Sequence, residues 1–211
     1  MVVREFFRAA ALALAVSCAA LAVPVPEARA GQDEEHEHHQ HEHSAPPEYQ
    51  KAVKDYALPQ VDMVRSDGKK VRFPDEIDDG KAVLLNFVYT SCTAVCPLLS
   101  QTFAEFQNRL GAEAGKLRMV SISIDPEQDT PERLAEYARR YKAGPQWTHY
   151  TGTLGASVML QKAFQAYFGD KMHHRPVTFI RAAPGQPWVR LDGFVTPDDL
   201  DKEYRQLVRP G

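Results

Sequence analysis

A pair of cysteines between an expected strand and an expected helix is the feature that most constrains this chain. Residues 82–88 (Ala-Val-Leu-Leu-Asn-Phe-Val) form an almost unbroken apolar run, typical of a strand buried on both faces. Cys92 and Cys96 follow, and apolar residues at helical spacing then predict a helix over about 97–110. Pro97 suits the first turn of that helix, because its missing N–H would have no partner there.

The Cys-x-x-x-Cys spacing allows two kinds of chemistry. Residues four apart on a helical turn face the same way, so both sulfurs can approach one metal ion or close a tight disulfide. Free N–H groups and the positive end of the helix dipole favour thiolates here, the form that attacks disulfides and binds soft metals. A purely structural disulfide is the alternative, but closing so short a loop would restrict the unfolded chain little.

Residues 1–30 predict a secretory signal. Arg4 and Arg8 precede a short apolar stretch that contains Cys18, and residues 28–30 (Ala-Arg-Ala) form a cleavage site. The stretch is short for a membrane span, which needs about 20 residues. An uncleaved signal would nevertheless leave a membrane tether. Export places Cys92 and Cys96 where disulfides form and persist, and this type of signal indicates the bacterial periplasm.

Residues 31–57 are expected to be a disordered histidine-rich segment followed by a linker, with a short helix starting near residue 48. The histidine-rich part has almost no apolar content, so it cannot pack into a core. Its imidazoles suit copper, zinc or nickel, and we expect weak auxiliary metal binding there; a solvated linker is the alternative. The imidazoles belong to His36, His38, His39, His41 and His43. The formal net charge of −3 gives no indication of a nucleic acid partner.

The remaining residues, 58–211, alternate strands and helices. This pattern predicts an α/β fold with a central mixed sheet flanked by helices and an N-terminal β-hairpin turning at Asp67-Gly68. Further strands are expected over 117–124, 147–151, 177–180 and 188–191, and helices are expected around 131–141, 160–167 and 200–207. Asp129 is expected to cap a helix and Asp125 to end a strand, and a supporting role behind the metal ligands is the alternative for both. His149 is expected to be a hydrogen-bonded histidine within a strand.

His174 is the candidate third ligand. It lies just before a late strand, whereas the cysteines lie just after an early one, and such loops can meet at one edge of a sheet. Two thiolates and one imidazole suit copper in either oxidation state. From spacing alone, an ordinary surface histidine remains the alternative.

On these residues the sequence resembles the Sco family, copper chaperones of cytochrome c oxidase assembly with a thioredoxin-like fold. The resemblance covers about residues 58–208, and its matching stretches are 83–87, 89–97, 121–126, 129–132 and 174–180. It implies copper, as Cu(I) or Cu(II), bound by Cys92, Cys96 and His174, and it favours His174 over His173. The family commonly has Pro-Asp-Val between its cysteines, where this chain has Thr-Ala-Val at 93–95.

Two alternative functions therefore follow from the sequence. The first is a periplasmic, monomeric copper-binding chaperone that delivers copper to a cuproenzyme, above all the copper-site subunit of cytochrome c oxidase, without catalytic turnover. The alternative is a thiol–disulfide oxidoreductase that reduces target cysteines before metallation. Cys92 would then attack and Cys96 resolve, a thioredoxin-like reductant would restore the pair, and His174 would be dispensable.

Overall fold

The computed structural model describes residues 49–208; the expected signal and the histidine-rich segment lie outside the described residues. The strands are β1 (Tyr49–Lys54), β2 (Asp62–Arg65), β3 (Lys70–Arg72), β4 (Ala82–Val88), β5 (Leu117–Ser123), β6 (Trp147–Gly152), β7 (Val177–Arg181) and β8 (Trp188–Gly193). The α-helices are α1 (Phe73–Ile77), α2 (Val95–Leu110), α3 (Pro131–Arg140), α4 (Leu154–Ala163) and α5 (Pro197–Val208). Two 3₁₀ helices are η1 (Gly111–Lys116) and η2 (Lys171–His173). Within residues 49–208, no helix combines the length and apolar character needed to cross a membrane.

The strands form one mixed sheet in the order β1-β8-β7-β4-β5-β6-β2-β3. β4, β5 and β6 run parallel, whereas β7 runs antiparallel to β4 and β2 antiparallel to β6. The predicted hairpin is confirmed: β2 and β3 pair antiparallel across a turn in which Gly68 adopts a positive φ of 85°. The mixed α/β sheet inferred from the sequence is therefore present.

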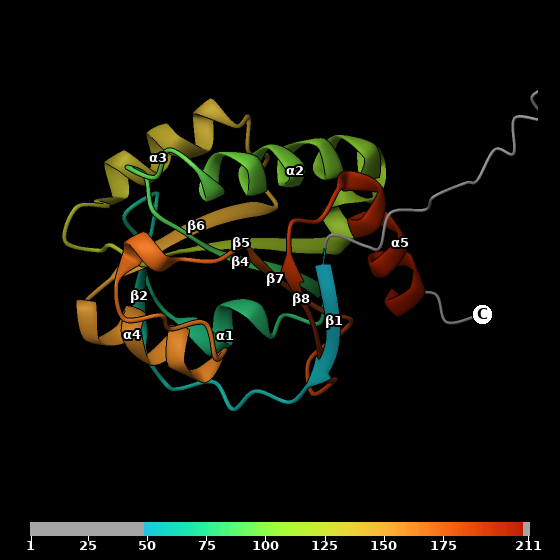
Figure 1. The fold of residues 1–211 in the computed structure, drawn as a ribbon, viewed down its shortest axis with the longest axis horizontal. Coiled ribbons are helices and arrows are strands. Elements are labelled where there is room, and N and C mark those ends of the chain that lie inside the picture. The colour runs from blue at the N-terminus through green and yellow to red at the C-terminus, as the bar shows by residue number, and fades with distance from the viewer. Residues whose placement is uncertain (1–48, 209–211) are drawn as a thin grey trace, which may run out of the picture. The chain divides into compact units, whose positions relative to one another are not determined.

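Helices cover both faces of the sheet (Figure 1). α2, α3 and α5 lie on one face, and α1 and α4 lie on the other. β4 serves both layers because alternate side chains of a strand point to opposite faces. Leu85 and Phe87 pack in the core cluster under α1 and α4, whereas Leu84 packs in the cluster under α2 and α5. All seven residues of β4 are buried, as its apolar run predicts.

The N-terminal boundary inferred from the sequence is wrong. Residues 49–54, which we expected within a linker and a short helix, form β1, and β1 pairs antiparallel with β8 from Tyr49 opposite Gly193 to Lys54 opposite Trp188. The edge strand is half solvated and therefore mostly polar, so it lacks the apolar run that marked β4. The domain thus begins before residue 58.

Strand direction brings three connections to one end of the sheet. β4 and β5 end together, with Val88 opposite Ser123. Because β7 is antiparallel to β4, with Thr178 opposite Asn86, its start lies at that same end. The loops that follow β4 and β5 and the loop that precedes β7 are therefore neighbours.

His149, in β6, is fully buried and differs from its prediction. Neither ring nitrogen has a hydrogen-bond partner among the described residues, so the expected hydrogen-bonded histidine is not found. The ring instead stacks on Trp147 at 5.2 Å between centroids and meets Tyr137 edge-on at 5.9 Å. Burial lowers the pKa of His149 from 6.5 to about 3.

This burial predicts a pH-dependent stability. Below pH 6.5 the unfolded chain binds a proton at His149 that the folded protein does not bind until about pH 3. The contribution of neutral His149 to the free energy of unfolding is therefore complete above pH 6.5. It is lost as the pH falls toward 3, by at most about 1.4 kcal/mol per pH unit. In urea unfolding between neutral pH and about pH 4.5, His149→Phe should flatten this decline. His173→Phe, at an exposed histidine, is the control; equal slopes in wild type and His149→Phe would refute the prediction.

Candidate functional site

The cysteine loop (residues 89–94) joins β4 to α2 and places the two sulfurs side by side. α2 begins at Val95, so Cys96 lies in its first turn and Cys92 lies just before it. The Cys96 N–H donates to the sulfur of Cys92 at 3.3 Å, and the Cys92 N–H donates to the carbonyl of Tyr89 at 3.2 Å. Both cysteines are free thiols in the structure.

The two thiols have opposite electrostatic environments. Burial acts to raise the pKa of Cys92, but hydrogen bonds from the N–H groups of Cys96 and Ala94 outweigh it, and the pKa lies below its ordinary value. Cys96 is fully buried, and this burial raises its pKa well above the ordinary range. The expectation of favoured thiolates is thus met at Cys92 and is wrong at Cys96. The pair combines one accessible, readily ionised sulfur with one buried, protonated sulfur.

His174 lies in the histidine loop (residues 164–176), which joins α4 to β7. Its side chain is 8% exposed, and Nε2 is 3.1 Å from the carbonyl oxygen of Phe87, at the end of β4. A carbonyl oxygen only accepts, so Nε2 carries the proton and Nδ1 keeps its lone pair. Nδ1 is buried and has no partner among the described residues. Burial also lowers the pKa of His174, which favours the neutral ring.

Tyr89, the first residue of the cysteine loop, connects this loop with His174. Its ring meets that of His174 edge-on at 6.4 Å between centroids. Its hydroxyl hydrogen-bonds to Cys92, and burial, followed by this hydrogen bond, raises the pKa of Tyr89, so the phenol stays neutral. The sequence pattern alone did not identify Tyr89 as part of the site.

The candidate ligands share one end of the sheet, but they do not form a ready-made metal site. Cys92 and Cys96 are brought together, whereas no three Cys, His, Asp or Glu side chains within residues 49–208 stand close enough to hold a metal ion. His174 must therefore move toward the sulfurs to complete a three-ligand site. His173 is exposed in η2. The auxiliary histidines at 36–43 lie outside the described residues.

A cavity of about 220 Å³ borders His174. Leu154 and Val158 of α4 line one side, and Phe168 and Lys171 of the histidine loop line the other. Because the cavity leaves part of the histidine loop without packing contacts, this loop is easier to displace than a close-packed segment. The cavity is consistent with the movement that three-ligand binding requires of His174.

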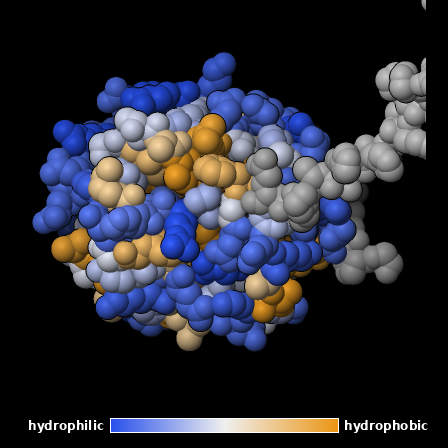
Figure 2. Space-filling view, viewed as in Figure 1, coloured by the Kyte–Doolittle hydropathy of each residue, from blue (hydrophilic) through white to orange (hydrophobic). Residues whose placement is uncertain are grey.

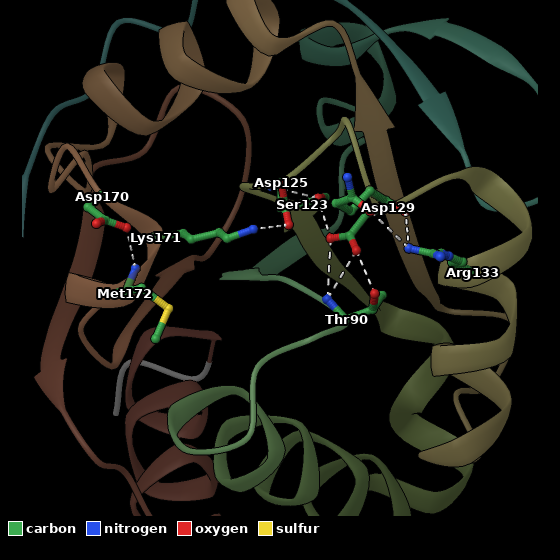
Figure 3. Close-up of polar contacts among 9 residues, drawn as sticks. Thr90, Ser123, Asp125, Asp129, Arg133, Asp170, Lys171 and Met172 are labelled. Atoms are coloured by element: carbon green, nitrogen blue, oxygen red, sulfur yellow. Dashed lines mark hydrogen bonds and ion pairs between the residues drawn. The ribbon is translucent and has the colours of Figure 1, made fainter.

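Asp129 was expected to cap α3, but the structure gives it another role. Thr130 is the N-cap, since its side chain accepts the Arg133 N–H at 3.3 Å. The Asp129 carboxylate is fully buried and accepts hydrogen bonds from the Thr90 hydroxyl at 2.6 Å and the Ser123 hydroxyl at 2.6 Å (Figure 3). The Thr90 N–H also donates to it at 3.1 Å. Asp129 thereby fastens the cysteine loop to the end of β5.

Apolar side chains gather on the surface beside the cysteine loop. Figure 2 shows an apolar patch over the first turns of α2 on a face that is otherwise mostly hydrophilic. Leu98, two residues after Cys96, is 57% exposed, and Met172 in η2 is 72% exposed.

The protonation of His174 yields a direct prediction. In the metal-free protein at neutral pH, long-range ¹H–¹⁵N NMR spectra should show His174 as the neutral ring with its proton on Nε2, because the Phe87 carbonyl accepts that proton. The exposed ring of His173 should instead show averaging between tautomers. A proton on Nδ1 of His174, or an imidazolium, would contradict the assignment of Nδ1 as the ligand atom.

Comparisons with known proteins identify relatives of this chain. The chain is 31% identical over 99 residues to the SCO1 protein homolog of Bacillus subtilis, covering 46% of this chain and 50% of the relative. The chain spans about half the length of the curated relatives that it matches at this identity.

Solved structures show the same thioredoxin-like fold. A SCO1/SenC family lipoprotein from Bacillus anthracis superposes with a TM-score of 0.64 at 22% identity, covering 74% of this chain and 98% of that one. Copper-bound ScoI from Arabidopsis thaliana gives 0.60 at 22% identity, covering 76% and 100%. The SCO1/SenC family model matches residues 52–208, which is most of the chain and nearly all of its described part. The chain belongs to the SCO1/SenC family.

Proposed function

We propose that this protein binds copper through Cys92, Cys96 and Nδ1 of His174 and delivers it to a cuproenzyme, most directly the dinuclear copper site of cytochrome c oxidase. The observation that carries the proposal is the buried Nδ1 of His174, which has no hydrogen-bond partner among the described residues and lies at the sheet end that also holds the paired sulfurs. Two sulfurs suit Cu(I), and the added imidazole suits Cu(II). The copper-bound state of the Arabidopsis relative supports copper as the cargo.

The three ligands would bind copper one after another. Cys92 is accessible and has the lowered pKa, so it would bind incoming copper first. Cys96 would lose its proton on binding as the second sulfur ligand. His174 would then move toward the sulfurs and bind as the third ligand through Nδ1, the nitrogen that the contact of Nε2–H with the Phe87 carbonyl leaves unprotonated. Delivery would reverse this order by ligand exchange with thiols of the recipient, so the copper is passed on without turnover.

The N-terminal residues would serve the same role. Residues 1–30 would direct export to the periplasm, with a membrane tether if the signal is retained. The histidines at 36–43 would raise the local supply of copper, since a tethered weak site increases the effective concentration of metal near a strong one. The protein would act as a monomer.

A thiol–disulfide oxidoreductase is the second candidate, and the asymmetry of the cysteines favours it. An accessible thiol of lowered pKa followed by a buried partner is the arrangement of an attacking and a resolving cysteine. In that role Cys96→Ser would trap a mixed disulfide with a target protein, and His174→Ala would be harmless. Dependence on His174 therefore separates the two functions.

Copper titration of the reduced full-length protein tests the proposal. All proteins in the titration carry Gln at the five N-terminal histidines, so that only copper binding by the folded domain is measured. The protein with this change alone serves as the reference and is called wild type here. One tight equivalent of Cu(I) is expected, and Cys92→Ser or Cys96→Ser should abolish it. His174→Ala should keep Cu(I) binding but weaken Cu(II) binding by at least about 10- to 100-fold, because losing even an outer partner of a metal ligand has that cost. His173→Ala is the matched control and should bind as wild type does.

Two results would refute the copper function. One is a reduced wild-type protein that does not retain Cu(I) against a chelator; the other is retention that survives both Cys→Ser changes. Rapid exchange of the cysteine pair with a protein disulfide, in a protein that fails to bind copper, would instead establish the reductase.

A further inference from the structure

The turn between β5 and α3 (residues 124–130) lies between the cysteine loop and the histidine loop and is bonded to both (Figure 3). Two acidic residues make these links from one short segment. Asp129 reaches the cysteine loop, and Asp125 reaches the histidine loop. The turn is itself compact, because the N–H groups of Gln128 and Asp129 both donate to the carbonyl of Asp125, at 3.0 and 2.9 Å. The two loops thus share one rigid connection.

The link to the cysteine loop is buried and complete. Asp129 accepts both the N–H and the hydroxyl of Thr90, two residues before Cys92. Ser123 joins the two acidic residues, since its hydroxyl donates to Asp129 and accepts the Asp125 N–H at 3.0 Å. Each group in this network has a partner, which is the condition under which a buried polar network holds one geometry.

The link to the histidine loop is one ion pair. Nζ of Lys171 lies 2.6 Å from Oδ2 of Asp125 and 5.9 Å from the ring centre of Tyr89. Lys171 is the first residue of η2, and its carbonyl accepts the His174 N–H at 3.1 Å. A shift of Lys171 is therefore transmitted to the backbone of His174 within one short turn.

We propose that Lys171 is a positioning residue for His174: its ion pair with Asp125 keeps the histidine loop within reach of the sulfurs, so that Nδ1 can complete the Cu(II) site. This inference rests on the proposed copper function. It assigns a role to a residue that the sequence pattern did not single out.

Burial explains why this ion pair should matter more than most surface pairs. Exposed ion pairs contribute little because water screens both charges. Here the Asp125 side chain is only 9% exposed, and Lys171 supplies the only cation paired with it among the described residues. Removing the cation leaves a nearly buried carboxylate whose hydration requires the loop to open. The expected movement is therefore outward, away from Cys92 and Cys96.

The test uses the full-length protein with two readouts, one of them metal-free. Lys171→Met should weaken Cu(II) binding about tenfold and change the Cu(II) electron paramagnetic resonance spectrum, while Cu(I) binding by the two cysteines stays at the wild-type level. Backbone amide exchange over residues 170–175 should quicken in the metal-free protein. Lys171→Arg should restore both readouts, because it preserves the charge.

Matched variants separate positioning from a general loss of charge. Asp125→Asn should reproduce Lys171→Met, and the double variant should be no worse than either single change, since both remove the same pair. Lys116→Met is the control: it removes a surface ion pair with Glu113 in η1, before β5 begins and so at the opposite end of the sheet. It should leave both readouts unchanged.

The outcomes are distinguishable from those of the copper function. Unchanged or tighter Cu(II) binding by Lys171→Met overturns the proposal, whatever the exchange rates, and so does an equal loss in the Lys116→Met control. If the wild type itself binds no copper, the proposed function fails. Exchange then decides alone whether Lys171 positions the histidine loop: faster exchange in Lys171→Met supports this, and unchanged exchange overturns it.

Discussion

The antiparallel pairing of β7 with β4 is the constraint on which the candidate site depends. It brings the start of one strand to the end of the other, and so places His174 beside Phe87 although they are 87 residues apart in the chain. The parallel pairing of β4 with β5 adds the turn that carries Asp125 and Asp129. No single segment could assemble these groups, because each loop contributes one kind of chemistry: sulfur, imidazole or carboxylate. The pairing of the strands, more than any local sequence motif, brings the residues of the site together.

The cysteine loop is held more firmly than the histidine loop. Asp129 is a fully buried carboxylate with three donors, and such a group stabilises a fold only while all its partners are present. It fixes the cysteine loop. The histidine loop is anchored at its start, where Arg190 donates to the carbonyls of Phe164 and Gln165 at 2.8 and 3.1 Å. Near His174 it is held by the Lys171–Asp125 ion pair and by the contact of Nε2 with the Phe87 carbonyl, and it borders a cavity there. A fixed pair of sulfurs and an adjustable imidazole suit the proposed function, in which copper is bound and later released.

The sequence predicted the α/β class, the hairpin, β4, and the closeness of the two cysteines, because long apolar runs and turn residues are local signals. Its errors arose where partners distant in the chain decide the outcome. β1 is a strand only because β8 is available to pair with it. Asp129 stands one residue before the true cap, Thr130, and its real partners include Thr90, 39 residues earlier in the chain. The burial that leaves the ring nitrogens of His149 without a hydrogen-bond partner among residues 49–208, and that raises the pKa of Cys96, likewise depends on packing, which spacing does not reveal.

In the proposed copper-bound state, two sulfurs and one imidazole share the metal, although the metal-free structure keeps the imidazole away from the paired sulfurs. X-ray absorption spectroscopy of the Cu(II)-loaded protein, with Gln at the five N-terminal histidines, tests this most directly. We expect two sulfur scatterers and one imidazole in the protein with native His174, and loss of the imidazole signal alone in His174→Ala. A first shell without sulfur, or a wild-type imidazole signal that persists in His174→Ala, would contradict it.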